Sequence, residues 1–261
     1  MGSIGRLGGD AVAIRPRVMT ELFLIGIGTG NPDHLTRQAV KALNLVDLVM
    51  IPKKSGKADL AELRHAILAE VVTNPAVQIT EFDLPVRDAS HVDYHAGVHD
   101  WHQAIAKVWA ATLAQFGARR VALLVWGDPS LYDSTLRIAA LLTDVSVTVV
   151  PGITSLQALT AAHAIPLNDI GQAVTITTGR LLADGWPKGA QTVVVMLDGN
   201  CTFQILDPEG ISIWWGAYVG MAEQIILSGP LAQICDQIIQ TRAKARAAHG
   251  WIMDIYILRK A

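Results

Sequence analysis

The chain contains 261 residues, of which 51% are hydrophobic and 17% are charged, and its formal net charge at pH 7 is −2. This composition excludes a disordered protein, because disordered chains are poor in hydrophobic and rich in charged residues. The 21 basic and 23 acidic residues also exclude a polycationic nucleic-acid-binding protein, since no net positive charge attracts phosphates. The length is sufficient for one large or two small domains with a sizeable core.

The sequence predicts no membrane-spanning segment, although the mean hydropathy of +0.34 is high. The longest apolar stretch, residues 153–167, is interrupted by a histidine and a proline and is shorter than the roughly 18–20 residues that a spanning helix requires. Residues 1–18 are rich in glycine and arginine, and we interpret them as a disordered, partly vector-derived leader before a natural start at Met19. The two cysteines, Cys201 and Cys235, are too few for a disulfide framework, so we expect a cytoplasmic protein.

The first half of the chain alternates short apolar runs, typical of buried parallel strands, with helical patterns. The helical segments have apolar side chains at intervals of three or four residues. This alternation indicates a parallel α/β sheet. We expect strands at residues 22–27, 48–51, 77–84, 121–126 and 145–150. The first helix should begin at Asn31, and three others should span residues 59–70, 92–116 and 132–142.

The second half contains more strands and fewer helices. Two of its expected strands, residues 211–219 and 224–227, are close enough to pair as a hairpin, so this sheet should be mixed. We therefore predict two α/β domains, with a parallel sheet in residues 19–149 and a mixed sheet in residues 150–261. The other strands expected here are residues 174–178, 192–197 and 252–258, and the helices are residues 155–164, about 200–206 and 231–248.

Three glycine-bearing loops follow expected strands and indicate a ligand site. They are Gly26–Asp33 (GIGTGNPD), Trp126–Tyr132 (WGDPSLY) and Val150–Ser155 (VPGITS). Glycines after a strand let backbone amides approach a ligand at the positive end of the next helix. Ligands of open α/β sheets bind at the carboxyl ends of the strands. Each loop alone is compatible with a tight turn or a helix cap, but three loops that can meet at one crevice favour a binding site.

A dinucleotide-binding fingerprint fits the first loop poorly. Its third glycine would fall at Asn31, and the second strand ends in Ile51–Lys54 (IPKK), where an acidic residue should bind the ribose. A nicotinamide-dependent oxidoreductase is therefore a weaker alternative. A non-catalytic dimerisation module is another, and the three converging loops argue against it.

These motifs, in this order and at these distances, resemble the tetrapyrrole methyltransferases, which are class III S-adenosylmethionine-dependent enzymes. The resemblance covers about residues 21–261. It implies two α/β domains with S-adenosylmethionine in the cleft between them, usually in a homodimer. The matching segments are GIGTGNPDHLT (26–36), GDPSLY (127–132), VVPGITS (149–155), TTGR (177–180) and EQIILSGPLAQI (223–234).

Within the family, three segments resemble the enzymes of aerobic cobalamin biosynthesis that methylate the first ring carbon of precorrin-5 and release acetate. The segments are the first loop, KKSGKADLAELR at residues 53–64 and FDLPVRD at residues 82–88. The resemblance therefore implies a C-methyltransferase acting on a precorrin. Another precorrin or uroporphyrinogen methyltransferase of the same family is the alternative, because the cofactor loops are shared.

The resemblance also implies a set of site residues. One of them departs from the family, because many relatives have proline where this chain has Thr29. Methyl transfer depends mainly on positioning of the donor and the nucleophile, so we expect no catalytic triad. The residues implied to bind the cofactor are Thr29, Trp126, Gly127, Asp128, Leu131, Thr154, Ser155, Met196, Tyr218 and Val219.

Acetate release requires water to attack a carbonyl, which favours a proton acceptor or a donor to the oxyanion. Tyr132, Asp133 and Asp128 are near one another in the second loop, and Tyr132 is our candidate catalytic residue. The many carboxylates of a precorrin also call for basic side chains, arginine above all, because it can bind a carboxylate through two hydrogen bonds. The candidates are Lys53, Lys54, Arg87 and Arg180.

A row of histidines, His91, His95, His99 and His102, has the spacing of one helical stripe. Such spacing can bind zinc. The sequence has no HExxH motif and no cysteine near this row, so we expect a solvated or carboxylate-facing helix surface and no metal.

Overall fold

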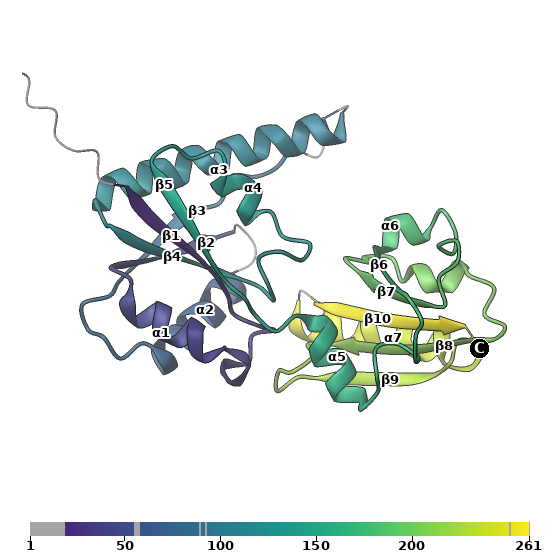
Figure 1. The fold of residues 1–261 in the computed structure, drawn as a ribbon. Coiled ribbons are helices and arrows are strands. Elements are labelled where there is room, and N and C mark those ends of the chain that lie inside the picture. The colour runs from purple at the N-terminus through teal and green to yellow at the C-terminus, as the bar shows by residue number, and fades with distance from the viewer. Residues whose placement is uncertain (1–18, 55–57, 89, 92, 251, 261) are drawn as a thin grey trace, which may run out of the picture.

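Two five-stranded sheets lie side by side in the computed structural model (Figure 1). The first has the strand order β3-β2-β4-β1-β5 and is parallel throughout, and the second has the order β6-β7-β10-β8-β9 and is mixed. The predicted fold class, a parallel sheet followed by a mixed sheet in an α/β protein, is confirmed. The expected leader at residues 1–18 lies outside the residues that the structure describes, which are 19–54, 58–88, 90–91, 93–250 and 252–260.

The first sheet is covered by helices on both faces (Figure 1). Alternate side chains of β1 point to opposite faces, so Phe23 and Ile25 pack with α1 and α2, whereas Leu22 and Leu24 pack with α3 and α4. The strands are β1 (Thr20–Gly26), β2 (Leu48–Lys53), β3 (Gln78–Asp83), β4 (Arg120–Val125) and β5 (Val145–Val150). The helices are α1 (Arg37–Leu45), α2 (Ala58–Val71), α3 (Tyr94–Phe116) and α4 (Thr135–Ala139).

The second sheet is covered by α7 on one face and by α5 on the other. Its predicted hairpin is confirmed, because β8 and β9 pair antiparallel with Trp215 opposite Leu227. The strands are β6 (Val174–Thr178), β7 (Thr192–Met196), β8 (Ile211–Ala217), β9 (Ile225–Pro230) and β10 (Asp254–Lys260). The helices are α5 (Ser155–His163), α6 (Gly179–Leu182) and α7 (Leu231–His249), with short 3-10 turns η1 (Pro32–His34) and η2 (Thr202–Ile205).

The predicted start of the first helix was wrong. The Asn31 side chain accepts a hydrogen bond from the backbone of Asp33, but this cap begins only the three-residue turn η1. Leu35 then returns to an extended conformation, and α1 begins at Arg37 with Thr36 as its N-cap. The chain therefore makes two separate capped turns where the sequence pattern suggested one helix.

The helix predicted at residues 132–142 is also shorter than expected. Tyr132 has a φ of 50°, which a right-handed helix does not allow, and α4 spans only Thr135–Ala139. Helix α6 was not predicted, because a helix of four residues is too short to show apolar periodicity.

The histidine row forms a common stripe only in part. Asp93 is the N-cap of α3, so His91 precedes the helix, while His95 and His99 are exposed. His102 is instead buried in the core, and burial lowers its pKa. Among the residues that the structure describes, no three histidine, cysteine, aspartate or glutamate side chains form a metal-binding group.

The chain passes from the first sheet to the second between β5, which ends at Val150, and β6, which begins at Val174. The predicted domain boundary at residues 149–150 coincides with the end of β5 and stays a prediction. No helix in the described part of the chain is long and apolar enough to cross a bilayer.

Candidate active site

The loops that follow β1, β4 and β5 contact one another directly. Gly28 and Gly127 form an isolated antiparallel bridge, in which the Gly127 N–H donates to the Gly28 carbonyl at 2.7 Å. A Cβ atom at Gly26 would lie 2.6 Å from the backbone nitrogen of Gly152. The three strands are neighbours in the sheet, in the order β4-β1-β5, so the three predicted loops meet at one edge.

Asp128 joins the second loop to the third. Its carboxylate accepts hydrogen bonds from the backbone N–H of Ser130 at 2.8 Å, from the Ser130 hydroxyl, and from the backbone N–H of Gly152 at 2.9 Å. Burial raises the pKa of Asp128, but these hydrogen bonds outweigh burial and hold the pKa below its ordinary value. Asp128 therefore maintains the shape of the loops.

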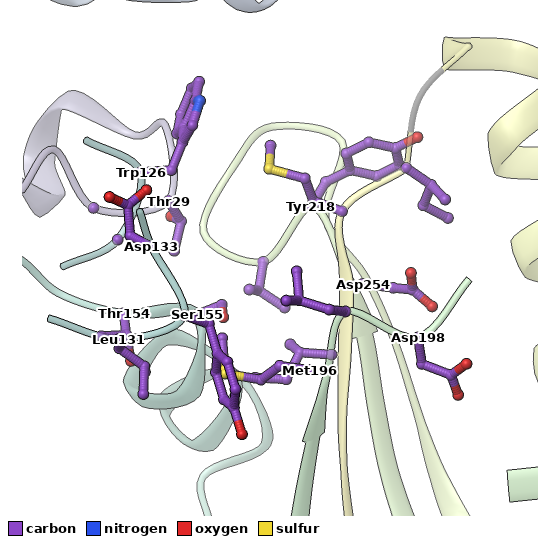
Figure 2. A pocket seen from close by; sticks show the side chains of 18 of the residues that line it. Thr29, Trp126, Leu131, Asp133, Thr154, Ser155, Met196, Asp198, Tyr218 and Asp254 are labelled. Atoms are coloured by element: carbon purple, nitrogen blue, oxygen red, sulfur yellow. The ribbon is translucent and has the colours of Figure 1, made fainter. Parts of the chain in front are cut away.

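The third loop ends in the N-cap of α5. The backbone N–H of Leu156 donates to the Thr154 hydroxyl at 3.2 Å, and the backbone N–H of Thr154 donates to Gln157 Oε1 at 3.0 Å, which completes a capping box. The N-terminal turn of α5, with Thr154 and Ser155, thus borders the space between the two sheets, where the helix dipole favours negative charge (Figure 2).

A cavity of about 570 Å³ lies between these loops and the second sheet (Figure 2). This volume falls in the range of roughly 300–1,000 Å³ that is typical of small-molecule sites. The second-sheet side is formed by the end of β7 and the segment after it, the turn after β8, helix α7 and the beginning of β10 with the residues before it. The residues lining that side are Met196–Gly199, Tyr218, Val219, Arg242, Arg246 and Ile252–Ile255.

All ten residues predicted to bind the cofactor line this cavity, and their part in binding stays a prediction. The hydroxyl of Thr29 lies 2.9 Å from Nδ1 of His34, which fixes the side chain at the position where many relatives have proline. The ten residues are Thr29, Trp126, Gly127, Asp128, Leu131, Thr154, Ser155, Met196, Tyr218 and Val219.

The candidate catalytic residue Tyr132 also lines the cavity. Its hydroxyl donates a hydrogen bond to the carbonyl of Ile176 in β6, at 3.2 Å. Burial raises the pKa of Tyr132, so the phenol is protonated at neutral pH. The side chain is therefore a hydrogen-bond donor rather than a base.

The sequence did not reveal a buried polar network on the second-sheet side of the cavity. Arg242 donates to the Asp254 carboxylate through Nε at 2.8 Å and Nη2 at 3.2 Å, and Trp215 Nε1 donates to the same carboxylate at 3.1 Å. Tyr256 donates to Asp198 at 2.6 Å. Burial lowers the pKa of Arg242, but the contact with Asp254 raises it by a larger amount. The net pKa is above its ordinary value, so this cation is permanent.

The predicted substrate-binding residues do not line the cavity. Lys53 lies at the end of β2 with Nζ 3.4 Å from the carboxylate of Glu81, and Lys54 is exposed beside it. Arg87 and Arg180 are brought together instead, because their guanidinium carbons lie 5.3 Å and 4.8 Å from the centre of the Tyr94 ring. Arg87 follows β3 and Arg180 is in α6, so the two arginines come from opposite sides of the cleft.

A second cation lies behind the cavity wall. Arg64 of α2 is buried, and its guanidinium carbon lies 4.8 Å from the centre of the Trp126 ring. Burial lowers the pKa of Arg64 to about 10, and the negative charge of Asp133 opposes this effect. Asp133 itself lines the cavity, so a buried positive charge is near this wall.

Comparison with known proteins gives a consistent result. The family model of the Tetrapyrrole (Corrin/Porphyrin) Methylases matches residues 21–235. A precorrin-6A synthase [deacetylating] from Sinorhizobium sp is 48% identical over 250 residues, which are 93% of this chain and 96% of that protein.

Solved structures show the same fold. A cobalamin synthesis related protein (CobF) from Corynebacterium diphtheriae is 38% identical with a TM-score of 0.79, over 93% of this chain and 99% of that one. A uroporphyrin-III C-methyl transferase from Thermus thermophilus, complexed with S-adenyl homocysteine, is 19% identical with a TM-score of 0.58. It covers 92% of this chain and 97% of its own, and at this identity the likeness concerns the fold.

Proposed function

The chain belongs to the tetrapyrrole methylase family, and from this premise we propose that it converts precorrin-5 to precorrin-6A in cobalamin biosynthesis. The chain is an S-adenosylmethionine-dependent C-methyltransferase that methylates the first ring carbon and releases acetate. The high identity to a deacetylating precorrin-6A synthase, across nearly the whole of both chains, supports this activity over those of other methylases in the family.

The observation that carries the proposal is the cavity where the loops after β1, β4 and β5 face the second sheet. Its residues fit S-adenosylmethionine. The N-terminal turn of α5, at Thr154 and Ser155, suits the carboxylate of the methionine moiety. Apolar side chains of Leu131, Met196 and Val219 suit the adenosine moiety.

The cofactor supplies an activated methyl group, and the chain contributes positioning. Gly28 and Gly127 hold the loops close together, and Asp128 ties them to Gly152, so the walls of the cavity are rigid. Holding two reactants in line can lower the barrier of a displacement by about 7–11 kcal/mol in favourable cases. No proton transfer is needed for the methyl transfer itself.

Tyr132 is proposed to assist acetate release as a donor to the oxyanion. Water that adds to the acetyl carbonyl leaves a negative charge on the carbonyl oxygen, which a fixed donor stabilises. The phenol lines the cavity, and its single O–H would turn from the Ile176 carbonyl, 3.2 Å away, to donate to the oxyanion.

Substrate carboxylates are proposed to bind Arg87 and Arg180. Tyr94 holds both guanidinium groups over one ring, and neither has a carboxylate partner among the described residues. Two adjacent cations of this kind favour a polyanion. Lys53 and Lys54, exposed at the end of β2, would contribute at longer range.

We also propose that the chain forms a homodimer and is located in the cytoplasm. Strand β5 is at an edge of the first sheet, and Val147 and Val149 on it are exposed by 40% and 38%, which favours coverage by a second copy. Cys201 and Cys235 are both free thiols, which agrees with a reducing compartment. Light scattering of the purified protein measures the oligomeric state.

The proposed function is tested by incubating the purified chain with precorrin-5 and S-adenosylmethionine. Mass spectrometry of the tetrapyrrole should show one methyl group gained and one acetyl group lost, with one equivalent of acetate in solution. Binding is tested separately by thermal unfolding, because a ligand of the native state raises the melting temperature. Stabilisation by NADPH and none by S-adenosylhomocysteine would contradict the proposal.

A further inference from the structure

Four carboxylates line the cavity, and three of them have hydrogen-bond partners on both oxygens. Asp128 accepts from Ser130 through Oδ1 and from Gly152 through Oδ2. Asp254 accepts from Arg242 through both oxygens and from Trp215 through Oδ2. These two carboxylates have structural partners on each oxygen, so neither is free to take a proton from a reactant.

Asp198 is engaged in the same way. Its Oδ1 accepts from the backbone N–H of Asn200 at 3.0 Å and from the Thr202 hydroxyl at 2.9 Å. Its Oδ2 accepts from the backbone N–H of Thr202 and from the Tyr256 hydroxyl, both at 2.6 Å. All four acceptor positions are used to hold the segment after β7.

Asp133 is different, because only one of its oxygens is used. Its Oδ1 accepts from the backbone N–H of Thr135 at 2.6 Å and from the Thr135 hydroxyl at 2.5 Å. Its Oδ2 has no hydrogen-bond partner within the part of the chain that the structure describes. Figure 2 shows Asp133 on the same side of the cavity as Trp126 and Thr29, opposite Asp198 and Asp254. Thr135 therefore orients a carboxylate whose second oxygen is available to the cavity.

Two buried basic groups, Arg64 and His102, are near enough to interact electrostatically with this carboxylate. Burial lowers the pKa of Arg64, in α2, and the pKa of His102, in α3. The negative charge of Asp133 acts in the opposite direction on both pKa values. Neither forms an ion pair with Asp133 within 4.0 Å in the described residues, and His102 Nε2 has no hydrogen-bond partner there. The second oxygen of Asp133 is therefore not occupied by either basic group.

We propose that Asp133 is the proton acceptor that activates water for acetate release. The inference rests on the proposed function. Asp133 Oδ2 takes one proton from water while the water oxygen bonds to the acetyl carbon. The bond between the acetyl carbon and the ring carbon then breaks, and its electron pair stays on the ring carbon. That carbon receives the methyl group of the sulfonium donor. The acetic acid released ionises to acetate and a proton, and Asp133 passes its own proton to solvent.

Asp133 and Tyr132 are consecutive and both line the cavity, and the backbone at Tyr132 has a φ of 50°. A right-handed helix through residues 132–142 would have placed the two side chains about 100° apart around its axis. The phenol suits the carbonyl oxygen, and the carboxylate suits the water that attacks the carbonyl carbon.

The test compares Asp133→Asn with the wild type in a single turnover of precorrin-5, with acetate measured. Loss of a general base lowers rates by about 10²–10⁴-fold, so acetate release should fall at least 100-fold. The dissociation constant of S-adenosylhomocysteine, measured by calorimetry, should stay within threefold of the wild-type value. Asp236→Asn is the matched control, because Asp236 is an exposed aspartate of α7 outside the cavity. It should release acetate at the wild-type rate.

A second variant tests whether the loss of acetate release is caused by misfolding rather than by loss of the carboxylate. In Asp133→Ala, formate should restore part of the acetate release, because a free carboxylate can enter the vacated space, and chloride should not. Wild-type-like acetate release in Asp133→Asn, or the absence of formate rescue in Asp133→Ala, would overturn the assignment of Asp133. Failure of the wild-type chain to release acetate would instead overturn the proposed function.

Discussion

The contact between the three loops makes a sharp prediction for Gly152→Ala. A Cβ atom at this position would lie 2.1 Å from the carbonyl oxygen of Gly127 and 2.8 Å from the Cα of Gly26. Both neighbours are backbone atoms, so no side-chain rotation can relieve the clash. The loops must separate, which strains or breaks the hydrogen bond of 2.9 Å from the Gly152 N–H to Asp128.

The magnitude follows from these two effects. Overpacking at a rigid site costs about 1–3 kcal/mol, and loss of a hydrogen bond to a charged group costs about 1.5–3 kcal/mol. We expect a loss of about 3 kcal/mol in the free energy of unfolding. At roughly 2–4 °C per kcal/mol for a chain of this size, the melting temperature should fall by about 6–12 °C. The affinity for S-adenosylhomocysteine should fall at least tenfold, because the same loops line the cavity.

The assay is thermal unfolding by circular dichroism, combined with calorimetric titration of S-adenosylhomocysteine. Gly199→Ala is the matched control for stability, since a Cβ atom there would meet no heavy atom within 4 Å. It should melt within about 2 °C of the wild type, as expected for a substitution without strain. If Gly152→Ala also melts within about 2 °C and binds S-adenosylhomocysteine normally, the close contact of the three loops is wrong.

Three further predictions concern charged side chains. Arg242→Met leaves Asp254 buried without its cation, so urea denaturation should show a loss of about 3–5 kcal/mol, and an effect below about 1 kcal/mol would refute the reasoning. Arg87→Gln and Arg180→Gln should each raise the KM for precorrin-5 about tenfold at unchanged affinity for S-adenosylhomocysteine, and an unchanged KM would remove that arginine from the substrate site. Partial burial raises the pKa of Asp47. The hydrogen bonds from Arg120 and its positive charge lower the pKa by a larger amount, so it lies below its ordinary value. The stabilisation by Asp47 should therefore be complete above about pH 4 and disappear as the pH falls through the lowered pKa. The difference in melting temperature between wild type and Asp47→Asn should thus vanish in acid, and a difference that persists at pH 2 would contradict this origin.

The strands and the loops after them could be predicted because their signals are local. Buried parallel strands are continuous apolar runs, such as LFLIGI at residues 22–27, and each run ends at glycine or proline. Because the carboxyl ends of neighbouring parallel strands meet at one edge, three loops far apart in the sequence could be expected at one crevice. The errors arose where a local conformation interrupts a pattern, as at Tyr132 with its φ of 50°.

The polar network around Arg242 could not be predicted, because its signals are not local. Arg242 in α7 donates to the Asp254 carboxylate in β10, 12 residues away, and to the Asp198 carbonyl after β7, 44 residues away. A buried arginine on an amphipathic helix is indistinguishable from an exposed one until the opposite strand is known. The lysines at the end of β2 show the reverse case, since their charge and their position after a strand suggested substrate binding, but they do not line the cavity.

The two sides of the cavity differ in how their carboxylates are hydrogen-bonded, and the proposed roles of the two sides follow from this difference. On the second-sheet side, Asp198 and Asp254 have hydrogen-bond partners on both carboxylate oxygens, so this side is a rigid polar frame. On the first-sheet side, the loop after β4 leaves the helical conformation at Tyr132, and one carboxylate oxygen of Asp133 remains without a partner in the described residues. A transferase that only moved a methyl group would require positioning alone. The release of acetate adds a hydrolysis, for which the proposal assigns the donor and the acceptor to Tyr132 and Asp133 in the loop after β4.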